Sequence, residues 1–136
     1  MDTETLTRVD LAEAIEGYLE CAGWLVNESY DENTGRVTTE ERDDRGGPFS
    51  PLAVAHASDA VRDFLALIDG EDLDVYLSGR SMHDLGADLW LSRNGHGAGF
   101  FDRGREDAYA RLQDDASSYG EAYAYWNETT GEVNID

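Results

Sequence analysis

The stretch DLWLSRNGHGAGFFDR, residues 88–103, gives the strongest local signal for the fold. Two short apolar runs flank a centre of alternating glycines, which is typical of a β-hairpin with a tight turn. With the turn at the middle of the segment, Asp88 faces Arg103 and Trp90 faces Phe101, and both are favourable cross-strand pairs. We therefore predict an antiparallel hairpin in which Trp90 is buried.

Further hairpins are predicted on either side of this segment. Residues 122–135 read as two strands around a turn at 129–131, and a similar turn signal lies at 33–35. Residues 73–77 are a candidate for one more strand, and the charged stretch 40–47 is typical of an exposed loop.

Three amphipathic helices complete the expected fold. The first covers residues 10–22 and the third covers residues 106–119. The second begins at Pro51, after Ser50 as N-cap, and ends at Gly70. The sequence therefore predicts one α+β domain over residues 1–136. Its antiparallel sheet has four to six strands, including hairpins 88–103 and 122–135, and packs against two or three helices.

Charge is the most unusual property of the composition. Thirty Asp and Glu oppose ten arginines, there is no lysine, and the net charge is −20. Such a field repels nucleic acids and anionic membranes and attracts basic surfaces. A globule of this length has a diameter near ~37 Å, and duplex DNA of that length carries about 22 phosphate charges. Two interpretations stay open: a function that depends on charge, or the acid-rich, lysine-free composition of a halophile or a GC-rich genome.

The acidic residues of the helices lie on their outer faces. In the first helix they form a stripe ~15 Å long, which is the leading candidate for a partner-binding surface. The complete set of candidates is Asp10, Glu13, Glu16, Glu20, Asp59, Asp63, Asp107 and Asp114.

Residues 90–103 carry a motif that resembles the core W-L-T/S-R-N-G-H-G-A-G-F-W/F-D-R of a family of small acidic proteins, encoded largely by phages and other mobile elements. The resemblance extends to residues 18–22 with Trp24, and to residues 119–121. It implies cargo of a mobile element, such as an anti-CRISPR or antirestriction protein, and it assigns no catalytic residue. Phe101 stands where the family more often has tryptophan, and the family's lysines are missing, so the extreme charge belongs to this member.

The same motif gathers polar residues that can be interpreted chemically. Arg93, Asn94, His96 and Asp102 surround the predicted turn, and a histidine with an aspartate can act as acid and base. No nucleophile, metal set or phosphate loop accompanies them, so we favour a structural role for this group together with Trp90 and Phe101. The single cysteine, Cys21, is expected to act as a small apolar residue.

These observations predict a non-enzymatic inhibitor that mimics nucleic acid and binds a basic protein or complex of the host, of the CRISPR or restriction type. No cofactor, metal, nucleic acid or membrane is expected as a ligand. His56, Asp59 and Asp63, which the helical period places together on an exposed face, are not expected to hold a metal. The acidic N-terminus and the absence of a long apolar run predict a cytoplasmic protein. The alternatives are an accessory domain whose acidity serves solubility, and a hydrolase or nucleotide-binding enzyme that uses His96 and Asp102.

Overall fold

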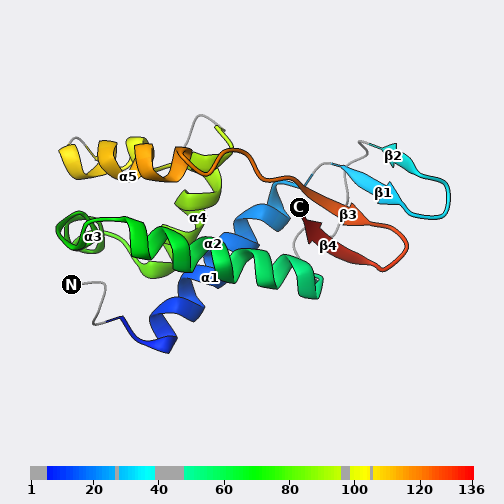
Figure 1. Ribbon diagram of the computed structural model, residues 1–136, viewed down its shortest axis with the longest axis horizontal. Coiled ribbons are helices and arrows are strands. Elements are labelled where there is room, and N and C mark those ends of the chain that lie inside the picture. The colour runs from blue at the N-terminus through cyan, green and yellow to red at the C-terminus, as the bar shows by residue number, and fades with distance from the viewer. Residues whose placement is uncertain (1–5, 27, 39–47, 96–98, 105) are drawn as a thin grey trace.

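The computed structural model describes residues 6–26, 28–38, 48–95, 99–104 and 106–136. Within these ranges the fold is α+β, as predicted, with five α-helices, one short 3₁₀ helix and a four-stranded sheet (Figure 1). The elements are α1 (Arg8–Trp24), β1 (Ser29–Asp31), β2 (Arg36–Thr38), α2 (Pro51–Leu67), α3 (Gly70–Leu77), α4 (Met82–Arg93), η2 (Phe100–Asp102), α5 (Asp107–Ser117), β3 (Ala124–Asn127) and β4 (Glu132–Ile135).

The predicted hairpin at residues 88–103 is wrong, because its first half is the end of α4 and its second half contains η2. Helix α4 starts with a capping box, in which Ser81 accepts from the backbone N–H of Asp84 and Asp84 accepts from that of Ser81. The helix is buried on several sides, so its apolar residues do not follow a single stripe. A short apolar run in a buried helix cannot be distinguished from a strand by periodicity.

Glycines determine how α1 crosses α4. A Cβ atom on Gly17 would collide with the backbone carbonyl of His83, and one on Gly86 would collide with that of Ala14. The two helix backbones therefore touch, which fixes α4 against α1 without intervening side chains.

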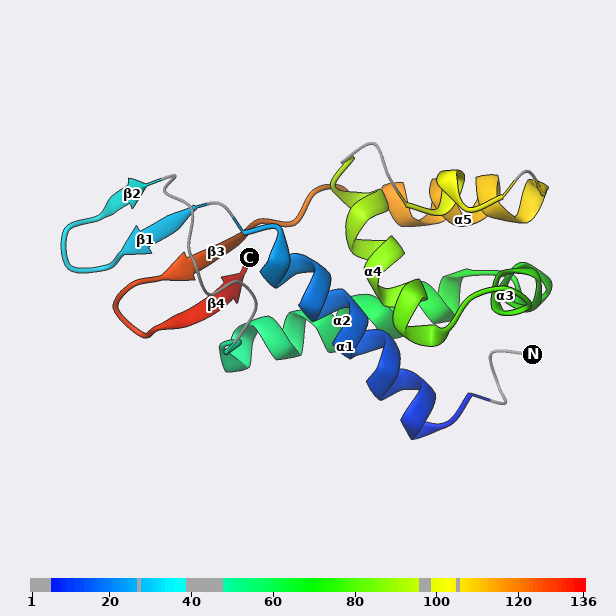
Figure 2. The same cartoon turned by 180° about the vertical axis from the view of Figure 1, so that it is seen from behind.

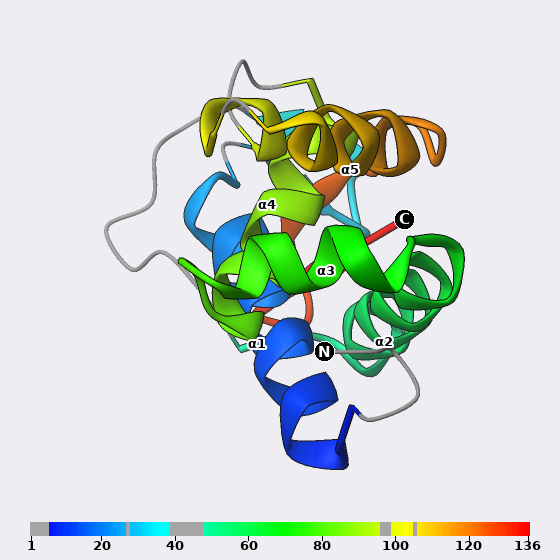
Figure 3. The same ribbon diagram turned by 90° about the vertical axis from the view of Figure 1, so that its left-hand side faces the viewer.

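The remaining helices follow the sequence in part. Ser50 caps α2 by accepting from the N–H of Ala53, and Pro51 is the first helical residue, as predicted. Gly70 does not mark the end of that helix but opens α3, whose N-cap is Asp69. The strand predicted at residues 73–77 is therefore wrong, since this segment lies in α3. Viewed along the long axis, α5 lies on one side of α3, and α1 and α2 lie on the other (Figure 3).

The sheet joins hairpins from the two ends of the chain, in the order β2-β1-β3-β4. Both predicted hairpins are present, and β1 pairs with β3 in parallel. The sheet is therefore mixed and not antiparallel. It also lies at one end of the helical body (Figure 1) instead of across two or three helices, and α2 contacts it through β4.

Aromatic side chains fill the core between the helices. Phe100 stacks on Phe64 with ring centroids 5.5 Å apart, and Tyr76 meets Phe100 edge-on at 5.3 Å. Tyr18 meets Trp90 edge-on at 5.3 Å on the α1–α4 side. No helix of the described ranges is sufficiently long and apolar to cross a membrane.

Candidate functional site

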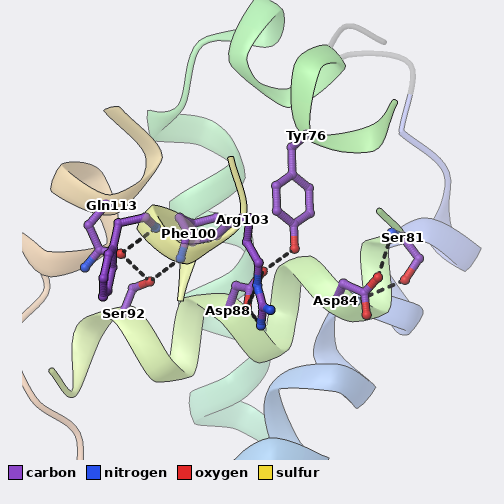
Figure 4. A network of polar contacts seen from close by, with 9 residues as sticks. Tyr76, Ser81, Asp84, Asp88, Ser92, Phe100, Arg103 and Gln113 are labelled. Atoms are coloured by element: carbon purple, nitrogen blue, oxygen red, sulfur yellow. Dashed lines mark hydrogen bonds and ion pairs between the residues drawn. The ribbon is translucent and has the colours of Figure 1, made fainter. Parts of the chain in front are cut away.

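Asp88 and Arg103, at the two ends of the segment 88–103, form an ion pair whose carboxylate is buried (Figure 4). Arg103, which follows η2, donates from Nε and Nη2 to the carboxylate of Asp88 on α4, at 2.7 to 3.1 Å. The Tyr76 hydroxyl of α3 donates to Asp88 Oδ2 at 2.5 Å. Asp88 is only 1% exposed, so its charge is compensated by side chains and not by water.

Arg103 and Tyr76 keep their protons near neutral pH. The hydrogen bond to Asp88 raises the pKa of Arg103. Burial, followed by the charge of Asp88, raises the pKa of Tyr76 far above neutrality. Neither group exchanges a proton near pH 7, which suits a structural ion pair better than acid–base catalysis.

A second set of contacts holds the start of η2 against α4. Ser92 Oγ accepts from the N–H of Phe100 at 3.1 Å and donates to Gln113 Oε1 of α5 at 2.8 Å (Figure 4). Gly99, directly before η2, has φ = 131°, and a Cβ there would collide with the Ser92 side chain. The last glycine of the motif is therefore required by a close approach of the chain to α4.

Arg93 and Asn94, at the end of α4, bind the segment between α5 and β3. Arg93 donates from Nε to the carbonyl of Gly120 at 2.9 Å and from Nη1 to the hydroxyl of Tyr18 at 3.1 Å. Asn94 Oδ1 accepts from the N–H of Ala122 at 2.8 Å. Both side chains thus position backbone, which agrees with the structural interpretation of the motif.

The other residues of the motif have separate locations. Trp90 is 3% exposed, as predicted, whereas Phe101 is 50% exposed, so the predicted Trp90–Phe101 pair is wrong. The indole Nε1 of Trp90 has no hydrogen-bond partner among the described residues. Asp102 is exposed in η2, and His96 lies outside the described residues. A His96–Asp102 catalytic pair therefore stays a prediction.

The acidic side chains of the first helix form what we call the α1 stripe: Asp10, Glu13, Glu16 and Glu20. The three glutamates are exposed. Asp10 is partly buried, and its carboxylate accepts from the N–H of Thr7 at 2.8 Å in a capping box. Three of the four carboxylates are thus presented to solvent along one helix.

Acidic residues on the other helices are exposed as well, namely Asp59 and Asp63 on α2 and Asp107 and Asp114 on α5. Burial, followed by the charges of Asp63 and Asp115, raises the pKa of Tyr119. Carboxylates of α2 and α5 therefore lie near one another. Helix α2 lies in front of α1 in Figure 1, and α1 lies in front of α2 in Figure 2, so acidic residues occur on helices that face opposite sides of the molecule.

His56 was expected on the exposed face of α2 with Asp59 and Asp63, and this is wrong. It is half-buried, and its Nε2 lies 2.7 Å from the hydroxyl of Tyr18. Burial, followed by the charge of Arg93, lowers the pKa of His56. The ring is therefore part of the contact between α1 and α2.

A different group of side chains has the geometry to hold a cation. Ligand atoms of Glu16, Glu20 and His83 lie within 4.8 Å of one another, and His83 Nε2 is 2.6 Å from Glu20 Oε2. Two carboxylates and one imidazole suit a divalent transition metal. The sequence did not indicate this group, because His83 is on α4 and 63 positions from Glu20.

Another polar contact that the sequence did not indicate joins α3 to α5. Arg111 donates from Nε and Nη2 to Asp72, which is buried, at 2.7 to 3.1 Å. The partners are 39 positions apart, and no local pattern links them. Two of the ten arginines thus compensate buried aspartates.

Comparison of the chain with protein-family models, with curated proteins and with solved structures gives no match in any of the three.

Proposed function

We propose that the protein is a non-enzymatic inhibitor that binds a basic nucleic-acid-binding protein or complex of its host in the place of nucleic acid. The observation that supports it most directly is the α1 stripe, in which exposed carboxylates follow one rigid helix. A defence complex of the CRISPR or restriction type is the class of partner that agrees with the resemblance to mobile-element proteins.

The spacing of the stripe suits this role. Asp10 and Glu20 are about 15 Å apart along the helix axis, and one strand of duplex DNA presents about four phosphates over that length. The three exposed carboxylates of the stripe, those of Glu13, Glu16 and Glu20, lie within the same length. Because Gly17 and Gly86 bring α1 and α4 into backbone contact, the helix backbone loses little conformational entropy when a partner binds.

The distribution of arginine supports the same role. Arg103 and Arg111 compensate buried aspartates, and Arg93 holds backbone and Tyr18. These three cations are paired with groups of the fold itself, although Arg111 is exposed, and the exposed acids are left in large excess. An excess of one sign accelerates encounter with a surface of the opposite sign.

The test is partner binding by charge-reversed proteins. The tagged protein is used to isolate partners from host cells, and the nucleic-acid binding of each purified partner is then measured with and without it. We expect inhibition that is complete near one copy per site, that DNA or RNA reverses, and that weakens as salt rises. Inhibition at far lower stoichiometry would contradict mimicry and would favour the enzyme alternative with His96 and Asp102.

A matched pair of variants tests the α1 stripe itself. Glu13→Lys, Glu16→Lys and Glu20→Lys together leave the capping residue Asp10 intact and reverse three charges on one helix. The control reverses Glu71, Glu121 and Glu128, three exposed carboxylates that lie outside α1, and gives the same net charge. Loss of binding in the first variant alone supports the stripe, and equal loss in both would reduce the effect to net charge.

A second candidate function is an accessory protein whose acidity maintains solubility at high salt. It is favoured by the acidic residues on α1 and α2, which face opposite sides. It predicts that molar salt stabilises the protein and that neither set of reversals removes a specific partner.

A further inference from the structure

The sheet carries a pocket that the proposed function has not used. It has a volume of about 420 Å³ and is lined by Tyr30 of β1, Val37 of β2, Tyr123 and Tyr125 around the start of β3, and Asp136 after β4. We call it the tyrosine pocket. Its volume is in the range of small-molecule and side-chain sites.

Strand register places these residues on the sheet face that points away from the core. Val133 and Ile135 of β4 are buried, so the alternate positions of this strand and of its neighbours face outward. Tyr125 pairs with Asn134, which lies between those two buried residues, and Tyr30 pairs with Val37. The tyrosines are therefore not required to fill the core.

The three rings are held in a fixed arrangement. Tyr123 and Tyr125 stack with centroids 5.3 Å apart, and Tyr30 stands edge-on to Tyr125 at 5.9 Å. The Tyr125 hydroxyl accepts from Asn134 Nδ2 at 2.8 Å, and the Tyr123 hydroxyl donates to the Glu28 carboxylate. Rings that are fixed before a ligand arrives lose little entropy on binding.

The electrostatics of the pocket favour a cation. The faces of tyrosine rings carry negative potential, and the hydrogen bond from Tyr123 to Glu28 increases the electron density of that ring. Asp136 adds a carboxylate, and it is tied to Tyr123 by two backbone hydrogen bonds of 2.9 and 3.3 Å. Among the described residues, none that lines the pocket is basic.

We infer that the tyrosine pocket binds an arginine side chain of a basic partner protein. A guanidinium is planar, stacks on aromatic rings and binds a carboxylate through two N–H groups, so the rings and Asp136 suit it better than a lysine ammonium. The identity of the partner as a basic nucleic-acid-binding protein rests on the proposed function. The chemistry of the pocket does not depend on it.

The test uses N-acetyl-arginine methylamide as the probe and follows the backbone amide signals of the protein by NMR. We expect shifts at β1, β3 and Asp136. The citrulline analogue has nearly the same shape without the charge, and it should leave these signals unchanged at the same concentration. The lysine analogue should bind more weakly than the arginine analogue. No partner protein is present in this experiment. Absence of arginine binding would therefore contradict the pocket proposal without testing the α1 stripe, and absence of partner inhibition would contradict the proposed function without changing the NMR result.

Two variants localise the site. Asp136→Asn changes an exposed side chain, and Tyr30→Leu keeps an apolar residue but removes one ring; each should reduce affinity roughly fivefold. Glu71→Gln on α3 removes an exposed carboxylate outside the pocket; it is the matched control and should bind as the parent does. The inference would be overturned if the citrulline or the lysine analogue bound as tightly as the arginine analogue. It would also be overturned if the NMR shifts lay on the α1 stripe and not at the pocket.

Discussion

Carboxylates have opposite roles in two regions of this molecule. Between α4 and η2, Asp88 is almost fully buried and accepts from Arg103 and Tyr76. On α1, Glu13 and Glu16 are exposed to solvent. A buried carboxylate depends on its partners for the stability of the fold, whereas an exposed one contributes little to stability and is available for binding. Burial and partners, not charge alone, thus decide what each acid of this very acidic chain does.

The largest effect is expected when the buried pair is broken. Arg103→Leu should lower the free energy of unfolding by about 3–5 kcal/mol, because Asp88 is left as an uncompensated buried charge. Urea denaturation measures this. Arg62→Leu, at an exposed arginine of α2, is the control and should change stability by less than about 0.5 kcal/mol. If both variants lose the same free energy of unfolding, the buried carboxylate does not depend on its partner more than an exposed charge does.

A comparison within the motif should give the next largest effect. Trp90→Ala should cost about 3 kcal/mol, the lower end of the range for large aromatic truncations, because it also removes the unpartnered indole N–H. Phe101 belongs to the same motif but is half exposed. Phe101→Ala should therefore lower the free energy of unfolding by less than about 1 kcal/mol. Thermal melts of both variants measure the difference, and similar losses would contradict burial of Trp90 alone.

A pH dependence of moderate size is expected at the α1–α2 contact. Burial lowers the pKa of His56 from its ordinary value of 6.5, so the unfolded chain binds a proton more readily than the native state does. Stability should therefore be complete above pH 6.5 and should fall as the pH drops toward the lowered value. His56→Gln should flatten this slope in melts between about pH 7.5 and about pH 5.5. If His56→Gln keeps the parent's slope of stability against pH, other groups cause that slope.

The smallest effect is expected on the α1 stripe. Replacement of Glu13, Glu16 and Glu20 by glutamine should leave the free energy of unfolding within about 0.5 kcal/mol of the parent. The same protein should lose affinity for a basic partner, if the proposed function is correct. A large loss of stability would show that the stripe supports the fold and does not serve binding alone.

Much of the fold could be predicted from local signals. Helices α1, α2 and α5 follow amphipathic periods, and the two hairpins follow turns that contain Gly35 and Gly131, both with positive φ. Asp88 and Arg103 do form an ion pair, but Asp88 lies in α4 and Arg103 directly follows η2, so the predicted cross-strand pair is wrong.

The remainder depends on contacts that no local pattern contains. Helix α4 is buried on several sides, so its periodicity is hidden, and Gly70 opens a helix because Asp69 caps it. Arg111 meets Asp72 across 39 positions of the chain, and Tyr76 of α3 meets Asp88 of the following helix, and neither spacing follows a helical or strand period. The tyrosine pocket requires β1 and β3 to be neighbours, which neither hairpin signal indicates.

The parallel pairing of β1 with β3 has a consequence for synthesis on the ribosome. Glu32 and Thr129, which meet where the two hairpins join, are 97 positions apart. When the first hairpin emerges, its open edge has no partner, and an isolated two-stranded hairpin is marginally stable. All five helices of the described ranges precede β3 in the chain. Translation therefore orders the two regions in time, because the helices can assemble first and the sheet is completed only when the final hairpin has been made.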